Sequence, residues 1–284
     1  MMPLRKFTIH QPKTVAEASE MLAEFGDNGR LYAGGTELLL AMKHDLLRYQ
    51  HLVDVKTIPE LNKIELKNGA LMIGSTVTHR SIERSSIVGE NLPVFADMET
   101  HVANVRVRAS GTLGGNLCFA EPHSDPATLL VALGAKAQIQ GKSSSKTIAI
   151  ERLITGSYET SLAADEILAS IEIPVLSKTQ RAAYLKFQLK ERPTLGLALV
   201  LDVEGDHIKK STAVVGSVSA LPTQSQNANQ LLIGSRAEVE KHLADAGEAL
   251  AEAADPVDDL EGSADYKRHL IGVFLRRAFL KAFS

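Results

Sequence analysis

The sequence predicts an α+β fold in three parts: an α/β lobe over residues 1–56, a second α+β lobe over 57–176 and a C-terminal α+β domain over 177–284. Strand and helix patterns alternate over the first part, which is typical of a small sheet covered by helices. Hairpin patterns follow in the second part, and two long amphipathic helices end the third. A chain of 284 residues is long enough to bury a large core and to hold two or three such units.

The first lobe is expected to contain three short strands and two helices. Thr14 and Glu17 form a capping box at the start of the first helix, and Gly26 ends it. The apolar residues of this helix share one face, which predicts that it packs onto the sheet. In chain order the expected elements are strand 7–10, helix 15–25, strand 31–33, helix 37–47 and strand 51–55.

The second lobe is expected to begin with a β-hairpin and to continue as a mixture of helices and strands. Asn68-Gly69 between two apolar runs is a strong hairpin pattern, because both residues tolerate a positive φ. Thr78 and Pro93 are each expected to start a short helix, and Asp125-Pro126 are expected to be the N-cap and first residue of an apolar helix. The expected helices are 79–84, 93–101 and 127–133, and the expected strands are 64–67, 71–74, 135–140, 145–150 and 167–173.

The C-terminal domain is expected to follow a linker over residues 176–181. Three apolar runs predict a three-stranded antiparallel sheet, with Glu204-Gly205-Asp206 as one of its turns. The expected elements are strands 183–189, 195–203 and 208–217 and helices 236–254 and 263–283.

The composition argues against several classes of protein. A net charge of -3 and a pI of about 6.3 give no bulk attraction to nucleic acid or to an anionic membrane, and no apolar run is long enough for a membrane span. The start of the chain lacks the apolar core of a signal peptide, and a single cysteine, Cys118, excludes an internal disulfide, so we expect a cytoplasmic protein. One cysteine is too few for an iron–sulfur cluster, and nine unclustered histidines predict no metal site in this chain.

Two glycine-rich motifs are the strongest functional feature of the sequence. They are Leu31-Tyr-Ala-Gly-Gly-Thr-Glu37 and Ser110-Gly-Thr-Leu-Gly-Gly-Asn116. No Lys or Arg lies between Ala109 and Lys136, so an anion at the second motif would be held by backbone amides, which suits a phosphate. Neither motif has the spacing of a Rossmann site or of a Walker loop. From the residues alone, the motifs are either a two-loop cradle for a dinucleotide diphosphate or two ordinary turns.

In combination and spacing, these motifs resemble those of the FAD-binding subunits of molybdenum hydroxylases. The likeness is carried by residues 31–38, 110–125 and 165–174 and extends over nearly the whole chain. It implies the fold shared with vanillyl-alcohol oxidase and p-cresol methylhydroxylase flavoproteins, in which FAD lies between two α+β lobes. It also implies that this chain binds FAD and supplies no catalytic acid or base.

The same resemblance implies partner subunits. A small subunit would carry two [2Fe-2S] clusters and a large subunit the molybdopterin cofactor, with a dimer of heterotrimers as the expected assembly. Electrons would pass from the clusters to FAD and then to an external acceptor. Two alternatives stay open: a self-contained flavin oxidase of the same fold, and a non-enzymatic assembly module that has lost FAD.

The resemblance assigns FAD contacts residue by residue. The two motifs would wrap the diphosphate from opposite sides, and Asp125 would accept a hydrogen bond from a ribose hydroxyl or a loop amide. Lys186 would lie near the flavin ring, where a cation favours the negative charge of the reduced flavin. Leu168 would pack on the adenine or flavin, and Val102 stands where some relatives carry Phe. The full set of expected contacts is Leu31, Tyr32, Ala33, Gly34, Gly35, Thr36, Glu37, Leu38, Val102, Gly111, Thr112, Leu113, Gly114, Gly115, Asn116, Asp125, Leu168 and Lys186.

Other polar residues near the motifs are weaker candidates. Cys118 is expected to be a small packed residue, His123 a surface group, and His79 part of a solvated helix face. Substitution of valine for Gly114 or Gly35 is expected to abolish FAD binding while leaving most of the fold, because the new side chain would obstruct the diphosphate.

Overall fold

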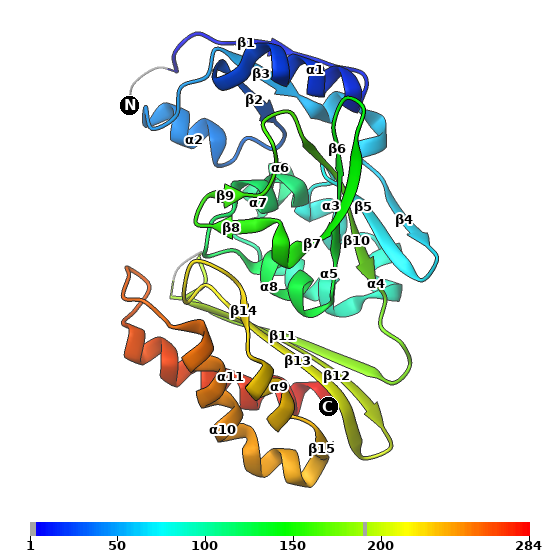
Figure 1. Ribbon diagram of the computed structural model, residues 1–284, viewed down its shortest axis with the longest axis vertical. Coiled ribbons are helices and arrows are strands. Elements are labelled where there is room, and N and C mark those ends of the chain that lie inside the picture. The colour runs from blue at the N-terminus through cyan, green and yellow to red at the C-terminus, as the bar shows by residue number, and fades with distance from the viewer. Residues whose placement is uncertain (1–3, 190–191) are drawn as a thin grey trace.

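The three parts of the chain are stacked along the long axis of the molecule (Figure 1), as seen in a computed structural model that describes residues 4–189 and 192–284. Residues 1–3, part of the stretch that was predicted to lack a signal peptide, lie outside the described residues. Each part has its own β-sheet, and helices lie against all three sheets. The α+β class expected from the sequence is therefore confirmed.

The first lobe is a small parallel sheet with two helices. Its strands, in the spatial order β1-β3-β2, are β1 (Thr8–His10), β3 (His51–Asp54) and β2 (Gly29–Tyr32). Helix α1 (Val15–Phe25) begins at Thr14, whose hydroxyl accepts from the amide of Glu17 as the capping box predicts. Helix α2 (Leu38–Lys43) is shorter than predicted, because Asp45 adopts φ of +58° and ends the helical path.

The second lobe contains a five-stranded sheet whose paired strands are antiparallel. In spatial order the strands are β4 (Ile64–Lys67), β5 (Ala70–Gly74), β10 (Ile167–Pro174), β6 (Lys136–Gln140) and β7 (Ser145–Ala149). Asn68 and Gly69, with φ of +51° and +76°, form the two-residue turn predicted between β4 and β5. A separate pair, β8 (Ile154–Gly156) and β9 (Glu159–Thr160), was not predicted.

Six helices lie on the second lobe, and three of them were not predicted. The expected ones are α3 (His79–Glu83), α5 (Pro93–Thr100) and α8 (Asp125–Ala132). The unexpected ones are α4 (Ser86–Asn91), α6 (Val105–Ser110) and α7 (Leu113–Phe119). Each of these three is only one or two turns long, too short for an apolar period to stand out in the sequence. The N-cap of α8 is Ser124 rather than Asp125, which is the first helical residue, so that prediction was wrong by one position.

The C-terminal domain has the three long antiparallel strands expected, which are β11 (Gln180–Phe187), β12 (Leu195–Glu204) and β13 (His207–Gly216). Two short strands, β14 (Thr223–Gln224) and β15 (Gly234–Ser235), also pair with β13 and were not predicted. The helices are α9 (Gln226–Leu231), α10 (Arg236–Ala254) and α11 (Ala264–Ala282).

Short 3-10 helices occupy Gly26–Asn28, Val55–Thr57, Pro59–Leu61 and Ile150–Arg152 in the first two lobes.

The C-terminal sheet is a layer buried on both faces, which ties this domain to the second lobe. Leu197, Leu199 and Leu201 of β12 point to α10 and α11, whereas Ala198 and Val200 join the core of the second lobe. Helices α5 and α8 contact this second face, and α11 contacts the first (Figure 1). Because both faces are covered, β12 is apolar at nearly every position. The orientation of the C-terminal domain is thus set by a shared core rather than by the connection at 176–181.

Candidate functional site

The first glycine motif lies in the turn that follows β2 and leads into α2. Gly35 has φ of +70°, and a Cβ atom there would lie 2.6 Å from Cε2 of Tyr32, so this position requires glycine. The backbone amides of residues 34–38 donate no hydrogen bond within the part of the chain that the structure describes. Five consecutive donors at the start of a helix are therefore available to an anion.

The two glycine motifs are in direct contact, although they lie far apart in the sequence. A Cβ atom at Gly34 would lie 2.2 Å from the carbonyl oxygen of Ser110 and 2.7 Å from Cα of Gly111. A Cβ atom at Gly111 would in turn lie 3.6 Å from Oγ1 of Thr36. Glycine at these positions lets the backbones of the two lobes touch, so the free amides of the first motif lie at the junction between the lobes.

The second motif forms the start of helix α7 instead of the loop expected from its glycines. Thr112 is the N-cap, and its Oγ1 accepts from the amide of Gly115 at 3.1 Å. The amides of Leu113 and Gly114 donate to the carbonyls of Val77 and Ser75, both at 3.0 Å. The expectation that this motif offers a row of free amides is therefore wrong, because the amides of Gly111, Leu113, Gly114, Gly115 and Asn116 all donate within the chain.

The two adjacent glycines of this motif face in different directions. Gly114 is buried, and a Cβ atom there would lie 2.4 Å from Cβ and 2.7 Å from the carbonyl oxygen of Ser75. Gly115 is exposed, and a Cβ atom there would approach only Oγ1 of Thr112, at 2.8 Å. Gly114 thus serves close packing between α7 and the turn after β5, while Gly115 and the half-buried Asn116 form the accessible part of the motif.

Asp125 and Lys186 form a buried ion pair between the second lobe and β11. Oδ2 of Asp125 accepts from Nζ of Lys186 at 2.9 Å, and Oδ1 accepts from the hydroxyl of Tyr184 at 2.7 Å. Nζ of Lys186 also donates to the carbonyl of His101 at 2.8 Å. Burial raises the pKa of Asp125, and the charge of Lys186 opposes this shift. Tyr184 was missed in the sequence, because a tyrosine in an apolar strand is by default a core residue.

The two apolar residues expected beside the cofactor are core residues in this structure. Leu168 is 2% exposed and Val102 is 5% exposed, and both belong to the hydrophobic cluster of the second lobe. Leu31 packs against the core of the first lobe. Any contact of these side chains with a cofactor would therefore be made at the edge of a core.

A buried His79–Glu99 pair lies beneath the second motif. Nδ1 of His79 and Oε2 of Glu99 are 2.7 Å apart, and the side chains are 2% and 0% exposed. The amide of His79 donates to the carbonyl of Gly111, and a Cβ atom at Gly111 would lie 3.4 Å from Cδ2 of His79. The expectation of a solvated His79 is therefore wrong, because α3 turns this residue inward under the junction of the lobes.

His123 connects the second lobe to the C-terminal domain. Its Nδ1 lies 2.9 Å from Oε1 of Glu121, and its Nε2 lies 3.1 Å from Oδ2 of Asp259. The hydrogen bond that the His123 ring donates to Glu121 raises the pKa of His123, against the effect of partial burial. Arg192 pairs with the same Glu121 oxygen at 3.3 Å. His123 is thus a link between domains rather than a surface group.

Cys118 fits its expected role as a packed residue. The residue is half-buried, and burial raises the pKa of its thiol to about 12. Such a thiol is a poor nucleophile.

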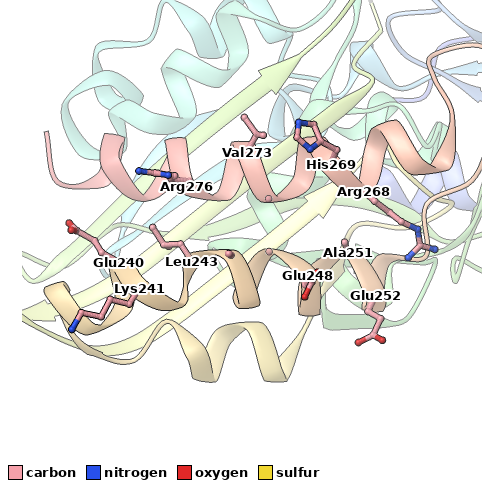
Figure 2. A pocket seen from close by; sticks show the side chains of 13 residues that line it. Glu240, Lys241, Leu243, Glu248, Ala251, Glu252, Arg268, His269, Val273 and Arg276 are labelled. Atoms are coloured by element: carbon pink, nitrogen blue, oxygen red, sulfur yellow. The ribbon is translucent and has the colours of Figure 1, made fainter.

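One hollow on the described surface lies away from the motifs, between α10 and α11. It has a volume of about 960 Å³, and Figure 2 shows Glu248 and Glu252 on one wall and Arg268, His269 and Arg276 on the other. Its charges are of both signs, and none of the expected cofactor residues lines it. Across residues 4–189 and 192–284, no group of three or more His, Cys, Asp or Glu side chains forms a metal site. Among the helices described, none is long and apolar enough to cross a membrane.

A row of free amides at the junction of two lobes suits an anionic ligand such as a diphosphate. Comparison with known proteins identifies the class more closely. Residues 5–176 match the family described as FAD binding domain in molybdopterin dehydrogenase, and residues 185–282 match the CO dehydrogenase flavoprotein C-terminal domain. The chain belongs to this family of FAD-binding oxidoreductase subunits of molybdenum hydroxylases.

The similarity to individual relatives extends over almost the whole of both chains. The chain is 31% identical to the carbon monoxide dehydrogenase medium chain of Afipia carboxidovorans, covering 97% of this chain and 96% of the relative. It is 30% identical to the nicotine 6-hydroxylase medium subunit of Paenarthrobacter nicotinovorans, covering 95% of each. A chain of the solved Cu,Mo-CO dehydrogenase in its cyanide-inactivated form superposes with a TM-score of 0.94 at 29% identity, covering 99% of both chains.

Proposed function

We propose that this chain is the FAD-holding, electron-transferring subunit of a cytoplasmic heterotrimeric molybdenum hydroxylase that assembles as a dimer of heterotrimers. Its partners are a small subunit with two [2Fe-2S] clusters and a large subunit with the molybdopterin cofactor. Electrons reach this chain from the clusters and leave it to an external acceptor. The bound flavin supplies the redox chemistry, and the protein supplies binding, orientation and electrostatics.

The observation that carries the proposal is the row of free amides at residues 34–38 against the backbone of Ser110 and Gly111. A diphosphate has acceptor oxygens for several of these donors, and the start of α2 adds a favourable dipole. On the other side, exposed Gly115 allows close approach and half-buried Asn116 offers an amide side chain. Thr36 adds a hydroxyl with no hydrogen-bond partner among the described residues. These groups fit a diphosphate held without Lys or Arg.

The other expected contacts have less direct support. Asp125 and Lys186 are in place to act together, since each is buried and held by the other. In this proposal Asp125 accepts from the cofactor through lone pairs that its protein donors leave open, and Lys186 places a positive charge on the flavin side. Leu168 and Val102 contribute core packing beneath the cofactor.

Substrate choice is assigned to the large subunit. Relatives named for carbon monoxide and for nicotine are 31% and 30% identical to this chain, so its overall similarity favours neither substrate. The single cysteine leaves no set of thiolates for an iron–sulfur cluster in this chain. The division of cofactors among three subunits is consistent with both points.

A Thr36→Val variant tests the cradle with little effect on shape. Removing a hydroxyl that binds an anionic diphosphate is expected to weaken FAD binding roughly 10- to 100-fold. The apo chain is titrated with FAD and the change in flavin fluorescence gives the dissociation constant. Thr212→Val is the matched control, because Thr212 lies half-buried in the C-terminal strand β13 and has no side-chain hydrogen bond recorded among the described residues.

The wider proposal is tested on the purified chain and its complex. A full-length chain that does not bind FAD would contradict the cofactor assignment. Purification without co-purifying iron- and molybdenum-containing subunits would contradict the heterotrimer. Oxidation of an alcohol or phenol by the isolated flavin-loaded chain would favour the self-contained oxidase instead.

A further inference from the structure

A buried polar cluster joins the start of α8 to strand β11 of the C-terminal domain. Asp125 is the first residue of α8 and is 4% exposed. Its two carboxylate oxygens accept from different side chains of β11, Oδ1 from the hydroxyl of Tyr184 and Oδ2 from Nζ of Lys186. Tyr184 is 3% exposed. Both oxygens are thus fixed by one strand, through side chains on the face of the C-terminal sheet that α5 and α8 cover (Figure 1).

The geometry of β11 and β12 selects the tyrosine hydroxyl specifically. Tyr184 and Lys186 are two residues apart in a strand, so their side chains lie on the same face. On the neighbouring strand β12, a Cβ atom at Gly196 would lie only 2.6 Å from the hydroxyl oxygen of Tyr184. The absence of a side chain at Gly196 leaves room for this hydroxyl beside Asp125. Core packing alone would need only the aromatic ring.

The start of α8 is also bonded to the second glycine motif. Ser124, which precedes Asp125, donates from its hydroxyl to Oδ1 of Asn116 at 2.7 Å. Asn116 belongs to the accessible part of that motif. The position of Asp125 and the position of Asn116 are therefore coupled through one hydrogen bond and the first turn of α8.

The groups that act on the pKa of Asp125 come from two segments, strand β11 and His101 at the end of α5. Burial raises its pKa, whereas the charge of Lys186, the hydrogen bonds from Lys186 and Tyr184, and the charge of His101 lower it. Burial and the neighbouring carboxylate raise the pKa of Tyr184 well above its ordinary value, so its hydroxyl keeps its proton and remains a donor. Without this donor, the carboxylate would keep Lys186 but lose the only hydrogen bond to Oδ1 among the described residues.

We infer that Tyr184 is a positioning residue of the cofactor site, which acts through Asp125 by donating to Oδ1 and so keeping this carboxylate ionised. The inference rests on the proposed function, in which Asp125 binds FAD. On this inference, strand β11 of the C-terminal domain contributes to the FAD affinity of the two preceding lobes.

The test is the pH dependence of FAD binding to the full-length apo chain. In wild type, binding is expected to weaken as the pH falls through the pKa of Asp125. In Tyr184→Phe this decline is expected to begin at a higher pH, by roughly one unit, because the loss of a donor disfavours the carboxylate. Above the decline, the two proteins are expected to bind FAD within about threefold of each other, since both carboxylates are then ionised.

The Asp125→Asn background separates positioning from general structural support. An asparagine does not titrate, so the decline is expected to disappear, and Tyr184→Phe is expected to cause no further shift in this background. Tyr266→Phe is the matched control, since Tyr266 is 41% exposed in α11 and makes no hydroxyl hydrogen bond recorded among the described residues. Denaturant unfolding of each apo variant verifies that it is folded.

The outcomes separate the inference from the proposed function. A loss of affinity in Tyr184→Phe that is equal at every pH, or that persists in Asp125→Asn, overturns the positioning role. An unchanged Tyr184→Phe also overturns it. If Tyr184→Phe does not fold, Asp125→Asn alone decides, because persistence of the decline in that variant refutes the role of Asp125. Failure of the wild-type chain to bind FAD overturns the proposed function itself.

Discussion

Gly114 and Gly115 are neighbours in the first turn of α7, yet alanine is expected to have opposite effects at the two positions. At Gly114 the added Cβ would approach the Cβ, carbonyl oxygen and Cα of Ser75 at 2.4, 2.7 and 2.8 Å. Overpacking of this kind costs roughly 1–3 kcal/mol, and contacts with backbone favour the upper end of that range. The better helix propensity of alanine offsets about 1 kcal/mol. The net loss of unfolding free energy is therefore about 2 kcal/mol.

At Gly115 the added Cβ meets only Oγ1 of Thr112, at 2.8 Å, and otherwise points to open space. The helix-propensity gain of up to about 1 kcal/mol is then reduced only by a small shift of the Thr112 side chain. Gly115→Ala is thus expected to be as stable as wild type or slightly more stable. Because this glycine is the exposed one, the same variant is expected to weaken FAD binding about tenfold, or by about 1.4 kcal/mol.

Denaturant unfolding of both apo variants measures the first effect, and FAD titration measures the second. A Gly114→Ala protein as stable as wild type would refute the close approach of α7 to Ser75. A Gly115→Ala protein with unchanged FAD affinity would show that the exposed side of the motif does not contact the cofactor. The structure also revises the expectation for valine at Gly114 and Gly35, since both substitutions would disturb the fold as well as FAD binding.

Two further predictions concern titrating groups. Because Glu121 and Asp259 raise the pKa of His123 above 6.5, protonated His123 stabilises the fold fully below about pH 6.5, and this stabilisation is lost as the pH rises through the raised pKa. As the pH rises through this range, the unfolding free energy should fall less in His123→Gln than in wild type. The exposed His44→Gln variant is the control and should follow wild type. Equal pH dependence in all three proteins would contradict the role of His123 in joining the second lobe to the C-terminal domain. Burial raises the pKa of the Cys118 thiol from an ordinary value of 9.0 to about 12, so this thiol should be alkylated about a thousandfold more slowly than in the unfolded chain near pH 8. Equal rates in the folded and unfolded states would contradict its burial.

The sequence by itself determined features that depend on residues close together in the chain. The Thr14 N-cap, the Asn68-Gly69 turn and the bounds of α10 at Arg236–Ala254 are as expected, because caps, turns and helical periods need only a few neighbouring residues. Only half of the Thr14 capping box forms, since the carboxylate of Glu17 accepts from the amide of Lys13 and not from that of Thr14. The single cysteine argued against an iron–sulfur cluster in this chain, because the number of cysteines is known without the fold. The two glycine motifs were also recognisable, and with them the family.

Only the tertiary structure decided what each glycine in those motifs does. Gly34 is needed for contact with Ser110 of the other lobe, Gly35 for its positive φ, and Gly114 for contact with Ser75. All three roles require glycine, so the sequence alone does not distinguish them. The structure likewise showed that the second motif starts helix α7. The first amides of this helix donate to the carbonyls of Val77 and Ser75, which lie in a distant segment that the sequence does not reveal.

The same limit applies to the polar residues around the site. His79 and Glu99 are buried together, and Tyr184 bonds Asp125 across 59 residues of chain. A histidine in a polar helix and a tyrosine in an apolar strand give no sign of such partners, because the partner is chosen by how the lobes and the C-terminal sheet pack. Local chemistry thus predicted the longer helices and strands and the two glycine motifs, whereas the packing of distant segments decided the short elements and how the two motifs lie against each other.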